Sequence, residues 1–429
     1  MIQRRLVLPI LLVALCGVAL PALAQLRGHG GPVRAVAVSA DGSRAITGSF
    51  DSTAILWSLS TSTAERVLRF HDSAVNAVAF LPDGRIATGG EDATIAIWQP
   101  GASTPERVLK GHTGPIVSLA ISPDGRMLGS ASWDRTARLW SLRDGASQVL
   151  EGHAQNVNGI AFTPDGRSVV TAGYDLTLRI WALDGRASPT VLTLPTPLNT
   201  VAVAPGGEIV AAGASGKVYV LSATGERLAE IEAEATPVIA VAVSGDGKLA
   251  AACSVRGAVA IIDLASRSLQ RLLLGPGLPA WSAAFLPDNR TLLTGGSDHL
   301  VRRWDALTGT RLGDTGLGTP GDPLAAYGND RGAQVFRACV ACHTLKAGEP
   351  PRAGPTLAGI FGRRIATAPG YDFSPALKQL DIVWTPETVS RLFEIGPATY
   401  TPGTKMPEQR VGAEDRAALV KFLERATRP

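Results

Sequence analysis

Phe80-Leu-Pro-Asp-Gly-Arg85 and Ile121-Ser-Pro-Asp-Gly-Arg126 are two copies of one pattern, in which an apolar run ends at a Pro-Asp-Gly turn. A second apolar run, a turn that contains Asp and a third run follow each copy, and the third run ends in Trp98 or Trp140. The alternation of residue types in Thr94-Ile-Ala-Ile-Trp98 is typical of a strand. The pattern therefore predicts a repeated all-β unit.

The unit recurs seven times over the first three quarters of the chain, and its closing positions lie 40 to 42 residues apart. These positions are Trp57, Trp98, Trp140, Trp181, Leu221, Ile262 and Trp304. A closing Trp at this period resembles the WD-repeat family, whose four-stranded blades close into a ring. The resemblance implies an all-β, seven-bladed β-propeller over residues 25–312.

Three further polar positions accompany the closing Trp in units 1 to 4. In the WD-repeat family these residue types form a buried hydrogen-bond chain within each blade, and the resemblance implies the same structural network here. The residues are His29, Thr47, Asp51, Trp57, His71, Thr88, Asp92, Trp98, His112, Ser130, Asp134, Trp140, His153, Thr171, Asp175 and Trp181. Four of the five histidines of the propeller are thereby assigned to structure, which weakens an enzymatic interpretation of this domain.

Units 5 to 7 depart from this pattern. Units 5 and 6 have Ala211 and Ala252 at the Thr position and no His, so we expect apolar packing in both. Unit 7 keeps its Thr, Asp and Trp but has Pro276 near the His position. The outer strand of blade 7 could come from residues 309–312 or from residues 25–27, and we favour residues 309–312 because the N-terminal segment is very short.

The chain outside the repeats divides into three further segments. Residues 1–24 combine Arg4 and Arg5, an apolar core and Ala22-Leu-Ala24, which is typical of a cleaved secretory signal peptide. We therefore expect an exported, periplasmic protein without a stable membrane span. Residues 313–327 begin with a Gly- and Pro-rich stretch that predicts a linker, and residues 328–429 form a second domain of different composition.

Cys339-Val-Ala-Cys342-His343 is the candidate functional motif of the second domain. A C-x-x-C-H run is what covalent attachment of a c-type haem requires, although C-x-x-C also occurs in thiol redox and zinc sites. Amphipathic helices are predicted before the motif, over residues 332–336, and near the end of the chain, over residues 413–426.

The order of the motifs in residues 328–429 resembles class I cytochrome c, an all-α domain. After the cysteines come the segment 354–363 and Pro402-Gly-Thr-Lys-Met406, which ends 63 residues after His343. The resemblance implies one covalent haem c per chain on Cys339 and Cys342, with His343 and Met406 as the axial ligands of the iron.

The same resemblance assigns supporting roles around the haem. Pro355 would accept a hydrogen bond from the axial imidazole, and Ser374 and Trp384 would bind a haem propionate. Gly332 and Phe336 would lie where the first helix crosses the last. Phe373 and Phe393 stand at positions where relatives often have Tyr.

Charge and motifs together favour an electron carrier. Residues 328–429 contain 14 Lys and Arg against 10 Asp and Glu, and no basic run predicts a nucleic-acid partner. We therefore predict one-electron transfer, with no catalytic residues, between this haem and a redox protein such as a periplasmic dehydrogenase, oxidase or reductase. The propeller would be the docking scaffold. The alternatives are a redox enzyme with a second site in the propeller and a haem-based sensor.

Overall fold

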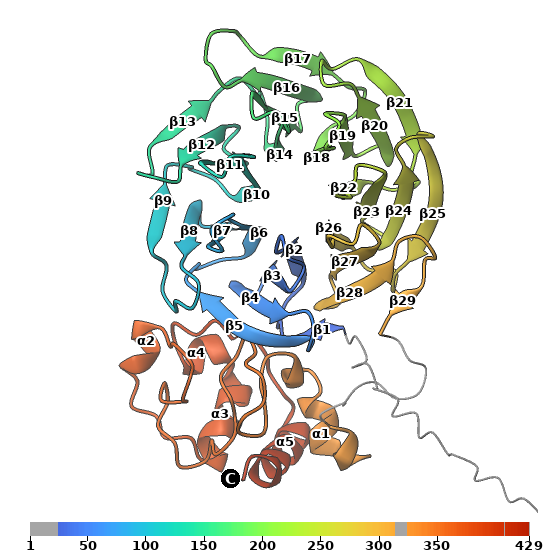
Figure 1. Ribbon diagram of the computed structural model, residues 1–429. Coiled ribbons are helices and arrows are strands. Elements are labelled where there is room, and N and C mark those ends of the chain that lie inside the picture. Colours follow the sequence, from blue (N-terminus) through green and yellow to red (C-terminus); the bar gives the residue numbers. More distant parts are fainter. Residues whose placement is uncertain (1–24, 314–323, 407, 429) are drawn as a thin grey trace, which may run out of the picture.

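The computed structural model describes residues 25–313, 324–406 and 408–428, so the predicted signal peptide lies outside the described residues. Seven antiparallel sheets are arranged as blades around a central axis, and a helical domain lies beside blade 1 (Figure 1). Within the described residues, no helix is long and apolar enough to cross a membrane. The all-β seven-bladed propeller that the repeats predict is confirmed.

Each blade follows the order of its sequence unit. Blade 1 contains β2 (Val33–Val38), β3 (Arg44–Ser49), β4 (Thr53–Ser58) and β5 (Thr63–Arg69), and blade 2 contains β6 (Val75–Phe80), β7 (Ile86–Gly90), β8 (Thr94–Trp98) and β9 (Arg107–Lys110). Blade 3 contains β10 (Ile116–Ile121), β11 (Met127–Ser132), β12 (Ala137–Ser141) and β13 (Ser147–Leu150), and blade 4 contains β14 (Val157–Phe162), β15 (Ser168–Gly173), β16 (Thr177–Ala182) and β17 (Thr190–Thr193). Blade 5 contains β18 (Leu198–Val203), β19 (Ile209–Gly213), β20 (Lys217–Leu221) and β21 (Arg227–Glu232), and blade 6 contains β22 (Val238–Val243), β23 (Leu249–Ser254), β24 (Ala258–Asp263) and β25 (Ser268–Leu274). Blade 7 contains β26 (Ala280–Phe285), β27 (Thr291–Gly296) and β28 (Leu300–Asp305), with β1 (Leu26–Arg27) and β29 (Arg311–Leu312) at its outer edge.

The Pro-Asp-Gly turns join the first two strands of a blade. In blade 3 the Asp124 carboxylate accepts hydrogen bonds from the Ser122 hydroxyl at 2.6 Å and from the Arg126 amide at 3.0 Å. Gly125 has a φ of +69°, a left-handed conformation that glycine adopts without steric cost. The turn residues therefore fix where β10 ends and β11 begins.

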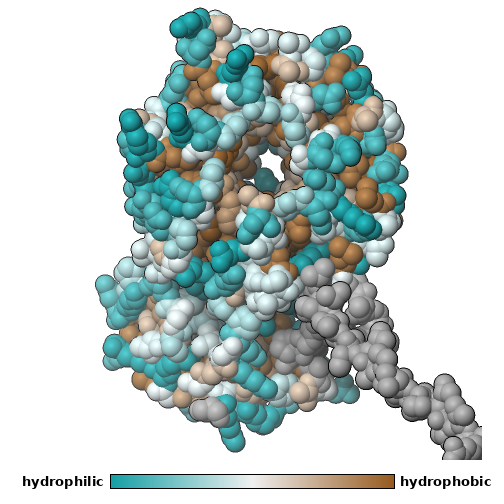
Figure 2. All heavy atoms as spheres, viewed as in Figure 1, coloured by the Kyte–Doolittle hydropathy of each residue, from teal (hydrophilic) through white to brown (hydrophobic). Residues whose placement is uncertain are grey.

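Apolar side chains from neighbouring blades interlock to form the propeller core. Ile46 and Ala54 of blade 1 pack with Val75 and Trp98 of blade 2 in one buried cluster. The inner strands leave an open channel along the axis, lined by apolar residues such as Val38 (Figure 2). Burial between blades, rather than within one, is what makes the ring a single unit.

Both ends of the propeller segment close the ring, which corrects our preference for residues 309–312 alone. In β1, Leu26 pairs with Val301, and in β29, Arg311 pairs with Trp304, so each short strand covers one half of β28. Leu26 is 1% exposed because it also joins the apolar cluster between blades 7 and 1. A strand as short as β1 is stable here because the burial of Leu26 adds to its backbone pairing with β28.

The C-terminal domain is built from short helices around one apolar cluster. Its elements are η1 (Ala325–Tyr327), α1 (Arg331–Phe336), η2 (Cys339–Ala341), α2 (Pro375–Lys378), α3 (Pro386–Ile395), α4 (Pro397–Tyr400) and α5 (Ala413–Ala426), with an isolated bridge between Arg364 and Val383. Helices α1 and α5 cross where Gly332 has no side chain, since a Cβ there would lie 2.2 Å from the carbonyl oxygen of Ala418.

The end of the predicted linker packs into this domain. Leu324 is 1% exposed within its apolar cluster, and the ring of Tyr327 contacts the ring of Phe422 edge-on, with the centroids 4.9 Å apart. Leu324 and Tyr327 have large apolar side chains, and burial of that apolar surface attaches this end of the linker to the domain.

Candidate functional site

The two motif cysteines lie on one helical turn. The backbone amides of Cys342 and His343 both donate to the Cys339 carbonyl, at 3.1 and 3.0 Å. Burial raises the pKa of the Cys339 thiol to about 11 and that of the Cys342 thiol to about 12. Both thiols are therefore held in the protonated form, unlike the lowered-pKa thiolate of a reactive redox cysteine. Among the described residues, no group of three or more His, Cys, Asp and Glu side chains is arranged to hold a metal ion.

His343 is held by one ring nitrogen. Its Nδ1 lies 2.7 Å from the Pro355 carbonyl oxygen, to which it donates as a neutral imidazole. Burial lowers the pKa of His343 and favours that neutral form. The hydrogen bond fixes the tautomer and leaves Nε2 as the nitrogen with a free lone pair, as an axial haem ligand requires.

Two residues that the sequence did not single out complete the support of His343. A Cβ on Gly354 would lie 2.6 Å from His343 Cε1, so the chain can pass the ring only as glycine. The Arg352 guanidinium donates to the carbonyl oxygens of Val340 and His343, the latter at 3.1 Å. The Gly354-Pro355 pair was a sequence signal for Gly354, but no local pattern identified Arg352.

Met406 lies in the loop before α5, and its half-buried side chain packs against the apolar cluster that contains Cys339 and Phe393. Its amide donates to the Thr404 hydroxyl at 3.1 Å, which shapes the loop. The thiol of Cys339 and the thioether of Met406 thus share one apolar cluster, and Cys342 and His343 follow Cys339 on the same helical turn. These residues fit a haem c, because its ligands are soft or neutral and its porphyrin needs apolar surroundings.

Ser374 and Trp384 have structural contacts besides their predicted role toward a propionate. The Ser374 hydroxyl caps α2 by accepting from the Leu377 amide at 3.3 Å, and it donates to the Gly403 carbonyl at 3.0 Å. It thereby joins α2 to the loop that carries Met406. The Trp384 side chain packs against the apolar cluster, and its backbone pairs with that of Arg363.

The predicted propeller network is present in blades 1 to 4 as a continuous relay. In blade 4, Trp181 Nε1 donates to the Thr171 hydroxyl at 2.9 Å, and that hydroxyl lies 2.8 Å from His153 Nε2. His153 Nδ1 lies 3.0 Å from the Asp175 carboxylate. The equivalent contacts join His29, Thr47, Asp51 and Trp57; His71, Thr88, Asp92 and Trp98; and His112, Ser130, Asp134 and Trp140. Every member is committed to its blade, so the relay serves structure.

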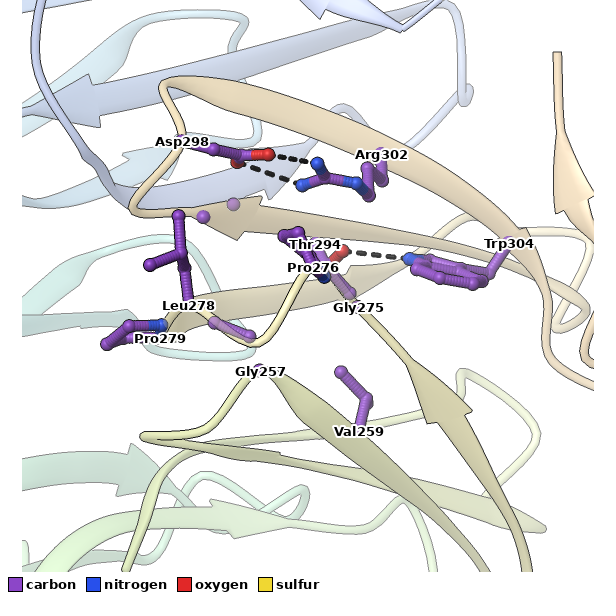
Figure 3. Close-up of a pocket in the computed structure, with 13 residues that line it drawn as sticks. Gly257, Val259, Gly275, Pro276, Leu278, Pro279, Thr294, Asp298, Arg302 and Trp304 are labelled. Atoms are coloured by element: carbon purple, nitrogen blue, oxygen red, sulfur yellow. Dashed lines mark hydrogen bonds and ion pairs between the residues drawn. The ribbon is translucent and has the colours of Figure 1, made fainter. Parts of the chain in front are cut away.

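The degenerate blades replace the relay in different ways. Blades 5 and 6 share an apolar cluster that includes Ala252 at the Thr position, which agrees with the expected apolar packing. In blade 7, Arg302 takes the partner role of the missing His by donating to Asp298 at 2.9 Å (Figure 3). A small pocket lies beside Pro276, and its volume of about 10 Å³ is roughly the minimum that admits one water.

Paired cysteines on one helical turn, an imidazole oriented by the Pro355 carbonyl and a thioether packed against the apolar cluster of Cys339 are the residue set of a c-type cytochrome domain, which lies beside the propeller. The cytochrome c family matches residues 329–427, and the WD domain, G-beta repeat family matches residues 21–58, 62–99, 103–141, 146–182 and 268–305. The five repeat matches omit blades 5 and 6, which lack the His, Thr and closing Trp of the pattern.

Known cytochromes c are similar to the second domain only. Cytochrome c of Cochliobolus lunatus is 42% identical over 100 residues, which are 92% of that protein and 23% of this chain. Cytochrome c of Arabidopsis thaliana is 42% identical over 88% of its length, and cytochrome c 2.1 of Caenorhabditis elegans is 39% identical over 86%. This chain belongs to the cytochrome c family through its C-terminal domain, and the family implies a covalently bound haem c and electron transfer.

Proposed function

We propose that the protein is an exported, class I electron carrier with a single haem c, which uses its propeller to dock a redox protein. The observation that carries the proposal is the combination of Cys339 and Cys342 on one helical turn with His343 fixed by the Pro355 carbonyl. When bound, haem c supplies one-electron chemistry at iron. Cys339 and Cys342 would hold it covalently, and His343 and Met406 would be the axial ligands.

The residues of this chain give that site its properties. The Pro355 carbonyl orients the His343 ring and raises the electron density on Nε2. The apolar cluster against which Met406 packs lowers the polarity on one side of its sulfur, and a soft thioether in such surroundings favours ferrous iron. Phe393, which is 5% exposed, belongs to this cluster and offers no hydroxyl toward the Met406 sulfur.

Exposed aromatic side chains support the docking role of the propeller. Phe50, Trp133 and Tyr174 are 44%, 46% and 44% exposed, and each directly precedes the Asp of its blade. Because this turn follows the second strand of blades 1, 3 and 4, the three rings lie toward the same end of the ring. Exposed aromatic groups at fixed positions are typical of surfaces that bind proteins. The partner would be a dehydrogenase, oxidase or reductase outside the cytoplasm.

Covalent attachment is tested by expressing the full chain in cells that mature c-type cytochromes. We expect haem to stay with the polypeptide on a denaturing gel, at one iron per chain, in a periplasmic fraction. Replacement of both Cys339 and Cys342 by Ser should abolish this attachment. Cys253→Ser is the matched control, because that thiol is buried in the propeller. Haem that remains attached to the double variant would contradict the proposal.

A further inference from the structure

The propeller contacts the cytochrome domain on the side that carries Cys342. The amide of Ala353 donates to the Gly28 carbonyl at 3.1 Å, and both residues are close in sequence to motif residues of their own domains. A Cβ on Gly30 would lie only 2.0 Å from Cys342 Sγ. The backbone of blade 1 therefore approaches the haem-attachment cysteine without an intervening side chain.

Arg69, at the end of β5, is the central side chain of this contact. Its guanidinium donates to the carbonyl oxygens of Arg352 and Ala353, at 2.7 and 3.1 Å. The same group lies over the ring of Tyr371, 4.1 Å from its centroid. A partly buried guanidinium with two carbonyl acceptors and an aromatic face is held in one orientation, as in a specific interface.

Blade 2 adds a contact through the equivalent loop. Lys405, next to Met406, donates to the His71 carbonyl and lies 3.7 Å from the Asp72 carboxylate. Asp72 follows His71 as Gly30 follows His29, so one position of two successive blades contacts the cytochrome domain. The Asp72 side chain is 92% exposed, and such an ion pair contributes little on its own.

Comparison among blades 1 to 4 shows that the propeller fold itself does not require glycine at position 30. The residue after the His is Asp72 in blade 2, Thr113 in blade 3 and Ala154 in blade 4. In all four blades its amide donates to the carboxylate of the blade's Asp, at 2.7 Å for Gly30 and 3.0 Å for Thr113. A side chain is thus compatible with the blade, and only blade 1, which faces Cys342, lacks one.

We propose that blades 1 and 2 are the internal docking partner of the cytochrome domain, and that Gly30 is the residue that allows the Cys342 side to close against them. A redox partner that approaches from that side must first displace the propeller. This consequence rests on the proposed electron-carrier function, whereas the docking itself rests on the contacts between the domains alone.

The test is Gly30→Thr in the full haem-loaded chain, which gives blade 1 the residue of blade 3. We expect small-angle X-ray scattering to show a larger maximum dimension than in the wild type. We also expect the Ala353 amide to exchange hydrogen at least about tenfold faster, because its acceptor belongs to the other domain. Thr113→Leu is the matched control, since this exposed position has the same place in blade 3 and lies outside the two blades whose contacts with the cytochrome domain are described above, and it should change neither measurement.

A second variant keeps the test decisive if Gly30→Thr does not fold. Arg69→Ala removes the guanidinium from the Arg352 and Ala353 carbonyls and should increase Ala353 exchange in the same direction. Wild-type scattering and wild-type Ala353 protection in the folded variants would overturn the proposal. Neither measurement depends on electron transfer, so failure of the docking proposal and failure of the proposed function are distinguishable.

Discussion

Thr171→Val removes one hydroxyl from the relay of blade 4 and keeps the shape of the side chain. Thr171 is fully buried, and its hydroxyl accepts from Trp181 Nε1 at 2.9 Å. The same hydroxyl lies 2.8 Å from His153 Nε2, to which it donates when Nδ1 carries the proton that binds Asp175. The substitution therefore leaves one buried donor and one buried acceptor without partners.

The expected loss follows from the number of orphaned groups. Each buried polar group left without a partner costs about 1–3 kcal/mol, so the two groups orphaned by Thr171→Val should lower the free energy of unfolding by about 2–6 kcal/mol. Thr294→Val in blade 7 provides the comparison. The Thr294 hydroxyl accepts from Trp304 Nε1 at 2.9 Å, but blade 7 has no relay His, so this change should cost only about 1–3 kcal/mol.

Urea unfolding of the full haem-loaded chain, followed by far-ultraviolet circular dichroism, measures both losses. The midpoint should fall further for Thr171→Val than for Thr294→Val, with unchanged slopes. The double variant Thr171→Val with Trp181→Phe also removes the indole donor that Thr171→Val orphans. Its loss in the free energy of unfolding should therefore be smaller than the sum of the losses of the two single variants. Equal losses for the two single variants, or no loss for Thr171→Val, would refute the argument that the relay hydroxyl satisfies two groups.

Three other predictions concern pH, the iron ligand and the helix crossing. Burial lowers the pKa of His153, so its folded value lies below the unfolded value of about 6.5, and urea unfolding should show stability falling as pH drops below about 6.5. Burial raises the pKa of Asp92, but hydrogen bonds from the His71 ring and from Thr94 outweigh it and lower that pKa to about 2, which adds a further loss between about pH 4 and pH 2. The ferrous Met406→Ala protein should bind carbon monoxide and the wild type should not, as absorbance spectra will show; the opposite pattern would exclude Met406 as an axial ligand. Gly332→Val should destabilise the cytochrome domain by about 1–3 kcal/mol in calorimetry, because its side chain would overlap α5, and an unchanged transition would contradict this crossing.

Local sequence signals identified the elements whose contacts are close along the chain. The motif cysteines needed only three-residue spacing to lie on one turn, and α5 has the predicted bounds, Ala413–Ala426. Helix α3 (Pro386–Ile395) was not predicted, although Thr385 accepts a hydrogen bond from the Thr388 amide and Pro386 is the first helical residue. Those two residues are a start signal that could have identified it.

Only the structure shows which residue replaces the relay His in blade 7. Pro276 at the His position indicated only that the relay was absent. The structure brings Arg302, four residues after Asp298, into the vacated place, where its guanidinium binds the carboxylate. The sequence contains many Lys and Arg side chains that could pair with the Asp298 carboxylate. The pairing of β27 with β28 determines that Arg302 is the one beside it.

The sequence by itself determined the seven blades, the relay within four of them and the haem-attachment motif, because each depends on periodicity or on fixed short spacings. Only the tertiary structure decided that β1 and β29 share the edge of β28, and that Gly30 lies against Cys342. The pairing of Leu26 with Val301 and the approach of Gly30 to Cys342 join residues hundreds of positions apart, and no local pattern encodes which surfaces meet. The physical reason is that burial and hydrogen bonding select such contacts from the three-dimensional arrangement of the blades and helices, which no short stretch of sequence contains.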